Sequence, residues 1–145
     1  MTEMQFSVEI NAPKERIWET LWGDKTFRDW AGIVDPGTYM VGELAEGSVV
    51  QFNSAEGYGV TSTIARLTPK EYILFKHKAD TKDHGASSRE EQWTGGSESY
   101  KLTEKNGITT LTLEFDVPAK LRRTMEVTYP KALSRIKELS ETYGS

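Results

Sequence analysis

Side chains that could act as acids, bases or nucleophiles are sparse in this sequence. The chain has two histidines and no cysteine, which excludes disulfides, catalytic thiolates and cysteine-ligated metals. It contains no glycine-rich phosphate loop with its lysine, no G-x-S-x-G and no H-E-x-x-H motif. We therefore expect no metal and no cofactor, and the sequence leaves any catalytic residue unknown.

His77 is the titratable residue whose environment matters most. In the segment YILFKHK it lies in phase with Ile73 and Phe75. If that phase faces the inside of the protein, His77 is a titratable group directed into an apolar region. If Tyr72 and Leu74 face inward instead, His77 is a surface residue. The alternation of a strand leaves both readings open.

The other polar candidates are isolated from one another. Glu98, Tyr100 and Arg66 fall in expected strands, where each is either a polar group on an interior face or a residue of the rim or outer surface. His84 lies in a polar segment and is expected to be solvated. Many carboxylates are present, but none forms a spaced pair that differs from a solvated face.

The elements that would hold these residues begin with a strand and a helix. Apolar residues alternate along residues 4–10, which predicts a strand with one buried face. Pro13 suits the first position of a helix, with Ala12 or Asn11 as the cap, and Gly23 ends that helix.

A second short helix is expected to begin with Asp24 as its cap and to carry Phe27 and Trp30. Three of the four tryptophans fall between residues 11 and 30. Trp18 and Trp22 are expected to pack in the core, whereas Trp30 is either a core residue or part of a cavity rim.

From residue 37 to residue 115 the pattern predicts antiparallel strands separated by turns, with Asn106-Gly107 at the tip of the clearest hairpin. The closing segment, about Ala119 to Tyr143, has apolar residues at helical spacing. Pro130 interrupts it, so we expect a kink or two helices that meet near Tyr129.

Residues 79–96 form a long charged segment without a clear pattern, which predicts either a lid or a disordered loop. Trp93 stands alone among polar neighbours in this segment. It is either an edge residue that pins the next strand or a contact over a cavity.

Composition limits the class of protein. With 145 residues the chain is expected to form a single domain over residues 1–145. The net charge of -4 without a basic stripe argues against a nucleic-acid partner, and no segment approaches the ~20 apolar residues of a membrane span. The absence of cysteine and of a secretion signal predicts a cytoplasmic protein.

Several segments together resemble the SRPBCC or START-like superfamily, and within it the branch named for the activator of heat-shock protein 90 ATPase. The matching segments are INAPKERIWETLWG through Trp30, EGSVVQF, TIARLTPKEYILF, SYKLTEKNGITTLTLEF and YPKALSRIKELSE. Branch members often carry a tryptophan early in the last helical stretch, where this chain has Tyr129 followed by Pro130.

The resemblance implies an α+β helix-grip fold, in which a curved antiparallel sheet of about seven strands wraps around a long C-terminal helix, with two short helices after the first strand. It also implies a cavity between the sheet and that helix. The residues expected to bind a ligand there are Trp30, Phe52, Phe75, His77, Tyr100, Phe115, Met125 and Tyr129.

Three functions are compatible with this resemblance. The first is binding of a small hydrophobic or amphipathic ligand in the cavity. The second is an enzyme of the cyclase, aromatase or hydrolase kind, with His77 or Glu98 as a proton-transfer group. The third is association with a chaperone, as the branch name implies.

Overall fold

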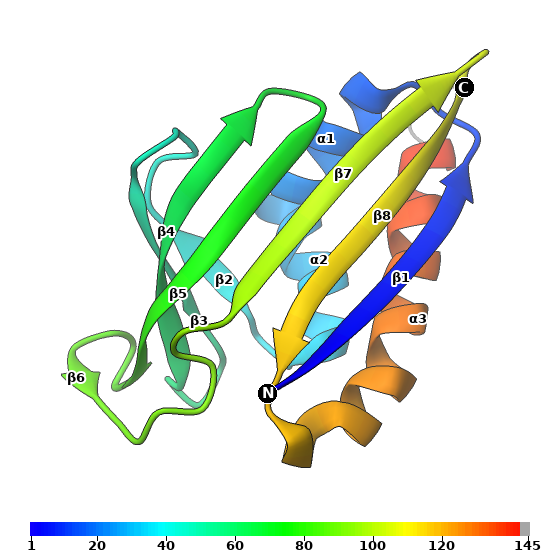
Figure 1. Ribbon diagram of the computed structural model, residues 1–145. Helices are drawn as coiled ribbons and strands as arrows, with labels where there is room; N and C mark the ends of the chain where they lie inside the picture. The colour runs from blue at the N-terminus through cyan, green and yellow to red at the C-terminus, as the bar shows by residue number, and fades with distance from the viewer. Residues whose placement is uncertain (143–145) are drawn as a thin grey trace.

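The chain forms one antiparallel sheet with three helices packed against one of its faces, as shown in the computed structural model of Figure 1, which describes residues 1–142. Tyr143, where the expected closing helix ends, lies outside the described residues. The elements in chain order are β1 Thr2–Ile10, α1 Lys14–Trp22, α2 Asp24–Val34, β2 Tyr39–Val41, β3 Val49–Asn53, β4 Gly59–Thr68, β5 Tyr72–Lys82, β6 Ser87–Ser88, β7 Ser97–Lys105, β8 Ile108–Val117, the 3-10 turn η1 Ala119–Leu121 and α3 Arg122–Thr142.

The strands follow the spatial order β1-β8-β7-β5-β4-β3-β2, and the two-residue strand β6 pairs with β5 outside this path. All pairs are antiparallel, and the first strand joins the last one. The helix-grip fold is confirmed, with seven strands in the continuous sheet and α3 against its inner face (Figure 1).

The alternation and turn signals that the sequence shows are seen again in the strands and in the hairpin of the sheet. In β1 the residues Met4 and Ile10 are buried while the residues between them alternate in exposure, because successive side chains point to opposite faces. The β7–β8 hairpin turns at Asn106 and Gly107, which have φ of 54° and 80°. These positive values suit the tight turn that an Asn-Gly pair favours, so this prediction is confirmed.

Both N-terminal helices begin one position away from the expected caps. Pro13 is itself the N-cap of α1, with an extended ψ of 154°, and its carbonyl accepts from the Ile17 amide. Asp24 is already the first residue of α2, because the Gly23 carbonyl accepts from the Phe27 amide at 2.7 Å. α2 extends to Val34 and carries both Phe27 and Trp30, as expected.

The closing helix is continuous. α3 passes through Pro130 without interruption, so the expectation of two helices is wrong. In Figure 1 the start of α3 runs at an angle to its C-terminal part, as expected for a proline that removes one backbone donor. Met125, Tyr129, Leu133 and Ile136 form its buried face.

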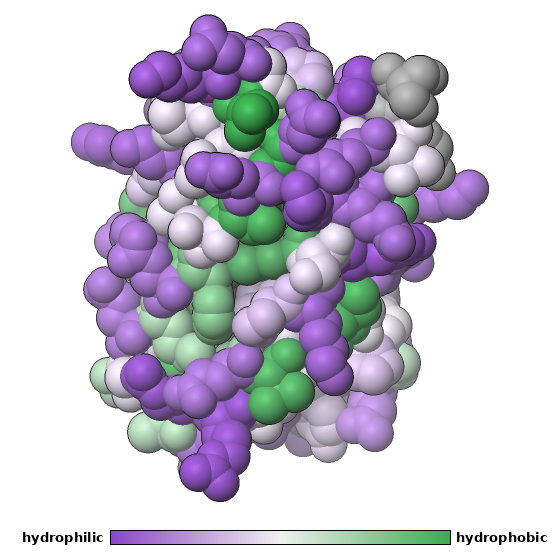
Figure 2. Space-filling view, turned by 90° about the vertical axis from the view of Figure 1, so that its right-hand side faces the viewer, coloured by the Kyte–Doolittle hydropathy of each residue, from purple (hydrophilic) through white to green (hydrophobic). Residues whose placement is uncertain are grey.

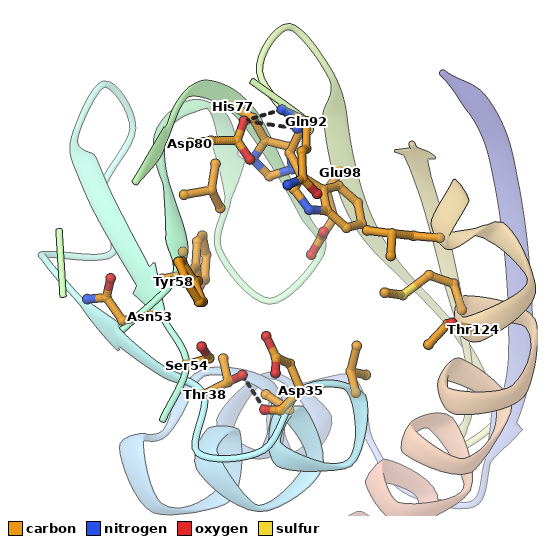
Figure 3. Close-up of a pocket in the computed structure, with 18 of the residues that line it drawn as sticks. Asp35, Thr38, Asn53, Ser54, Tyr58, His77, Asp80, Gln92, Glu98 and Thr124 are labelled. Carbon is orange, nitrogen blue, oxygen red and sulfur yellow. Dashed lines mark hydrogen bonds between the residues drawn. The ribbon is translucent and has the colours of Figure 1, made fainter. Parts of the chain in front are cut away.

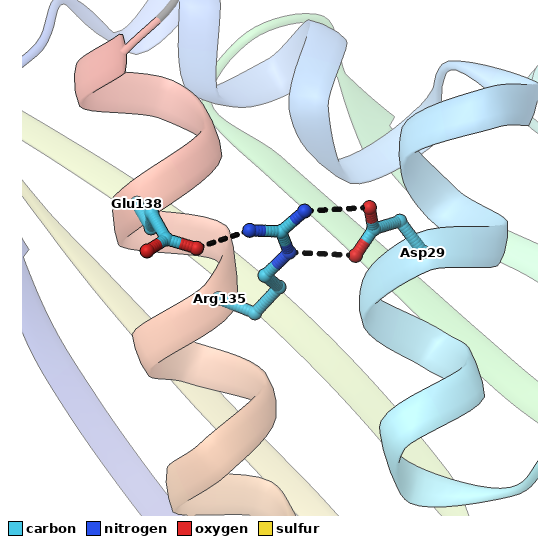
Figure 4. A network of polar contacts seen from close by, with 3 residues as sticks. All are labelled: Asp29, Arg135 and Glu138. Atoms are coloured by element: carbon cyan, nitrogen blue, oxygen red, sulfur yellow. Dashed lines mark hydrogen bonds and ion pairs between the residues drawn. The ribbon is translucent and has the colours of Figure 1, made fainter.

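One polar network fastens α2 to α3. The Arg135 guanidinium donates two hydrogen bonds to the Asp29 carboxylate, at 2.7 and 2.9 Å, and a third to Glu138 (Figure 4). The hydrogen bond from Arg135 lowers the pKa of Asp29. Since both partners are about one-third exposed, the pair contributes orientation more than stability.

Apolar contacts dominate the packing between helices and sheet. Figure 2 looks onto the side on which β1 and α3 lie and shows apolar residues in a depression between charged flanks. Phe6 of β1 stacks against Tyr129 of α3, with ring centroids 6.1 Å apart. Within residues 1–142, no helix has the length and hydropathy that a membrane span requires.

Candidate functional site

A cavity of about 420 Å³ lies between the sheet, α2 and the beginning of α3. Its walls come from α2, from strands β3, β4, β5 and β7, from the segment between β6 and β7, and from α3. Figure 3 shows this space opening between a wall that carries His77 and Glu98 and a wall that carries Asp35 and Ser54.

The structure brings six of the eight expected ligand-binding residues to this cavity. The six are Trp30, Phe52, His77, Tyr100, Met125 and Tyr129. Phe75 and Phe115 do not line the cavity and are buried behind its wall, where their rings pack against neighbouring aromatic rings. That these residues bind a ligand stays a prediction.

The structure resolves the orientation of His77. Ile73, Phe75 and His77 are buried on the inner face of β5, and His77 is only 6% exposed. Its Nδ1 lies 2.7 Å from the hydroxyl of the fully buried Ser62. Within residues 1–142 this is the one hydrogen bond of the Ser62 side chain, so we assign the hydroxyl as donor to Nδ1. With Nδ1 as the acceptor, the proton of the neutral ring lies on Nε2.

A β-bulge brings Asp80 to the same face as His77. Ser62 of β4 pairs with His77, but Thr61 pairs with Ala79, so Lys78 has no partner in the ladder. This extra residue reverses the alternation of β5. As a result Asp80, only 4% exposed, lines the cavity three positions after His77.

Asp80 holds the segment that follows β6. Its Oδ1 accepts from the amides of Gln92, Trp93 and Thr94 at 2.9, 2.9 and 3.0 Å, and from the Thr94 hydroxyl at 2.8 Å (Figure 3). Burial opposes the ionised form, but these hydrogen bonds together outweigh it and lower the pKa of Asp80. The carboxylate is therefore a charged clamp for residues 92–94.

The sequence predicts a lid or a disordered loop for residues 79–96, but parts of this segment belong to the sheet. β5 continues to Lys82, and β6 pairs back onto it. Further along, the Gly95 amide donates to the His77 carbonyl and the His77 amide donates to the Gly96 carbonyl. The Trp93 ring lies edge-on to the His77 ring at 6.2 Å and lines the cavity.

Glu98 and two tyrosines form a second polar group in the wall. Glu98 is half-buried, and its carboxylate accepts from the hydroxyl of Tyr100. Burial first, and the charge of Glu98 second, raise the pKa values of Tyr100 and Tyr129 well above the ordinary value. Both phenols therefore keep their protons and can donate hydrogen bonds inside the cavity.

The mouth of the cavity carries further charges. Asp35 follows the last turn of α2 and is exposed, and Glu56 lies in the turn between β3 and β4. Although the residue as a whole is exposed, its carboxyl group points into the cavity and is partly desolvated there (Figure 3). This desolvation, followed by the neighbouring charge of Glu56, raises the pKa of Asp35. Arg89 also lines the cavity, and its guanidinium stacks on the Tyr58 ring at 4.3 Å.

Several residues singled out in the sequence lie elsewhere. Arg66 is exposed and borders a separate surface depression. His84 is exposed, and its Nδ1 shares a hydrogen bond with Tyr39. Trp22 packs in the core as expected, and Trp18 is half-buried against it.

Sequence reasoning missed Asp80 and Asp35. Asp80 looked like one of many charged residues in a polar segment, and only the bulge turns it inward. Asp35 could have been noticed as the residue that follows a helix. In the part of the chain that the structure describes, no three His, Cys, Asp or Glu side chains are grouped to hold a metal ion.

The fold and the cavity define a helix-grip protein of the SRPBCC superfamily. A family model matches residues 11–141, and the chain belongs to the family described as Activator of Hsp90 ATPase homolog 1-like protein. A search among curated proteins found no match.

Solved structures share this fold at low sequence identity. The Aha1 dimer from Colwellia psychrerythraea superposes with a TM-score of 0.75 at 18% identity, over 100% of both chains. Protein MLL2253 from Mesorhizobium loti gives 0.76 at 13% identity, over 99% of this chain and 100% of that one. CalU16 from Micromonospora echinospora gives 0.64 at 15% identity, over 97% and 76%. At these identities the likeness concerns the fold alone.

Proposed function

We propose that this protein binds a small hydrophobic or amphipathic molecule in the cavity between the sheet, α2 and α3. The observation that carries the proposal is the cavity itself, about 420 Å³ in volume and lined by aromatic side chains from four different elements. Small-molecule sites are typically ~300–1,000 Å³, mostly apolar, with a few polar groups that orient the ligand. Trp30, Phe52 and Trp93 supply apolar surface, and His77 and Glu98 supply the polar groups.

Native mass spectrometry tests this proposal first. The purified protein is weighed under native and denaturing conditions, and any molecule that it carries appears as a mass lost on denaturation. A reproducible extra mass also gives the chemical class of the ligand. If no extra mass appears, the empty protein is screened with hydrophobic probes, since a weakly bound ligand is lost during purification.

A filled cavity should abolish binding. Val60 lines the cavity, whereas Thr63 lies on the opposite face of the same strand β4. Val60→Trp places a large ring in the cavity, and Thr63→Trp places the same ring outside it. We expect Val60→Trp to lose the bound molecule and Thr63→Trp to retain it. Equal binding by both variants would place the ligand outside this cavity.

An enzyme is the second candidate, because His77 and Glu98 both line the cavity and are side chains that can transfer protons to or from a bound molecule. The molecule identified by mass spectrometry is incubated with the protein and then analysed again. A changed mass that requires His77 or Glu98 would support catalysis, and an unchanged molecule supports binding alone.

The protein would bind this ligand in the cytoplasm, a location that the absence of cysteine favours because the cytoplasm is a reducing compartment.

A further inference from the structure

The charged side chains around the cavity are mostly acidic. Asp80 and Glu98 line its wall, and Asp35 and Glu56 flank its mouth. Among the described lining residues Arg89 is the one guanidinium or ammonium group, and it already lies over an aromatic ring. The electrostatic field of the cavity is therefore negative, which favours a positively charged guest over a negatively charged one.

The acidic groups differ in how much of their bonding capacity is used. The charge of Asp80 is offset by three backbone amides and a hydroxyl. Glu98 accepts one hydrogen bond, from Tyr100, and has no ion-pair partner among residues 1–142. An ionised carboxylate can accept about four hydrogen bonds, so most of the capacity of Glu98 is left for a ligand.

Two polar side chains in the wall are more than nine-tenths buried and have a free polar atom. Tyr129 is 7% exposed, and its hydroxyl has no hydrogen-bond partner within residues 1–142. His77 is 6% exposed, and its Nε2 is likewise without a partner there. Among the described residues only Trp22 Nε1 is a buried polar atom without a partner, so the Tyr129 hydroxyl and His77 Nε2 stay accessible. Because both residues line the cavity, these atoms are free to bond a polar group of a bound molecule.

Asp35, at the mouth of the cavity, adds negative potential on the wall opposite Glu98. α2 ends at Val34, so its last carbonyl groups and the partial negative charge of its C-terminus lie beside Asp35. In Figure 3 the side chains of Asp35 and Glu98 point toward one another from opposite walls of the cavity. Asp35 and Glu56 repel one another, and a cation between the two walls would relieve this repulsion.

We propose that the ligand of this cavity is an amphipathic amine, whose ammonium group lies between Glu98 and Tyr129 and faces Asp35. This inference rests on the proposed function and specifies its ligand class. An ammonium has three N–H donors, which match the Glu98 carboxylate, the free Tyr129 oxygen and the acidic mouth. The aromatic rings of Trp30, Trp93 and Tyr100 hold the apolar body, and rings of this kind also attract cations.

A carboxylate ligand such as a fatty acid fits the same space less well. Its charge would be repelled by Glu98, Asp80, Asp35 and Glu56, and Arg89 is the one guanidinium or ammonium group among the described lining residues to offset them. A neutral alcohol would keep the apolar contacts and could donate one hydrogen bond to Glu98, but it lacks the positive charge and the two further donors of an ammonium. The expected order of affinity is therefore amine, then alcohol, then carboxylate.

Three probes with one aromatic body test this order. They are 1-naphthylmethylamine, 1-naphthylmethanol and 1-naphthoate, titrated into the full-length protein by calorimetry at pH 7. We expect the amine to bind about tenfold more tightly than the alcohol, which is the size of one hydrogen bond to a charged group. Added salt should weaken binding of the amine and leave the alcohol unchanged.

Variants that remove one negative charge each show which carboxylate causes the preference for the amine. Glu98→Gln and Asp35→Asn should each reduce the preference for the amine, with Glu98→Gln the stronger of the two, and should weaken binding of the amine more than binding of the alcohol. Glu114→Gln is the matched control, because Glu114 is exposed on the outer face of the neighbouring strand β8. Each variant is first checked for an unchanged thermal transition.

The outcomes separate the two proposals. Preference for the amine that Glu98→Gln removes and Glu114→Gln preserves would support the inference. Equal binding of all three probes, tighter binding of the carboxylate, or an amine preference unchanged in Glu98→Gln would overturn it and leave a ligand-binding cavity. Failure of all three probes to bind would count against the proposed function as well as against the amine.

Discussion

Replacing Asp80 by alanine removes the acceptor that ties residues 92–94 to β5. One oxygen of Asp80 accepts three backbone amides and one hydroxyl, with donor distances of 2.8 to 3.0 Å. A hydrogen bond to a charged group contributes about 1.5–3 kcal/mol, and amides that reach water recover part of that loss. Since Gln92, Trp93 and Thr94 are half-buried, we expect a loss of about 2–4 kcal/mol and not four full contributions.

Asp80→Asn separates charge from geometry. The amide oxygen of asparagine keeps an acceptor at the same place, but it is neutral and has two lone pairs for the four donors, so we expect this variant to lose about 1–2 kcal/mol, less than Asp80→Ala. The pKa of Asp80 is lowered in the folded protein, so the unfolded chain binds its proton more tightly. The advantage of the wild type over Asp80→Asn should therefore be constant above the ordinary carboxyl range and vanish as the pH falls through the folded pKa.

Urea denaturation measures the free energy of unfolding of both variants, and amide hydrogen exchange of residues 92–94 measures whether the segment opens locally. The amides should lose protection in Asp80→Ala before the rest of the sheet does. The reasoning is refuted if Asp80→Ala stays within about 0.5 kcal/mol of the wild type and these amides keep their protection.

Three further predictions follow from the same contacts. Asp35→Asn should raise the free energy of unfolding at pH 7, because the raised pKa of Asp35 means that its ionised form is disfavoured in the folded protein; urea curves at falling pH should show the gain disappear. A double-mutant cycle of Asp29→Asn and Arg135→Gln should give a coupling of about 0.5–1 kcal/mol that shrinks in high salt, and a coupling of zero would contradict the role of this pair. Trp93→Leu should weaken binding of 1-naphthylmethanol while the thermal transition changes little, which calorimetry and circular dichroism can check.

The sequence by itself determined the order and type of most elements. Alternation along β1, the Asn106-Gly107 turn and the helical spacing in α3 are local signals, and each depends on residues that are close in the chain. Six of the eight residues that the family resemblance implies for the cavity do line it. Local alternation did not decide this for His77, because it left open which face of its strand is the inner one.

The tertiary structure decided which polar and charged side chains meet around the cavity. The bulge at Lys78 exists only because β5 pairs with β4, and it alone places Asp80 beside His77. Once there, Asp80 binds amides more than ten residues away and thereby orders the segment that carries Trp93. Asp35 and Glu98, 63 positions apart in the numbering of the chain, face one another only because α2 packs across the sheet (Figure 3). These contacts depend on pairing between distant segments, which no local pattern of residues encodes.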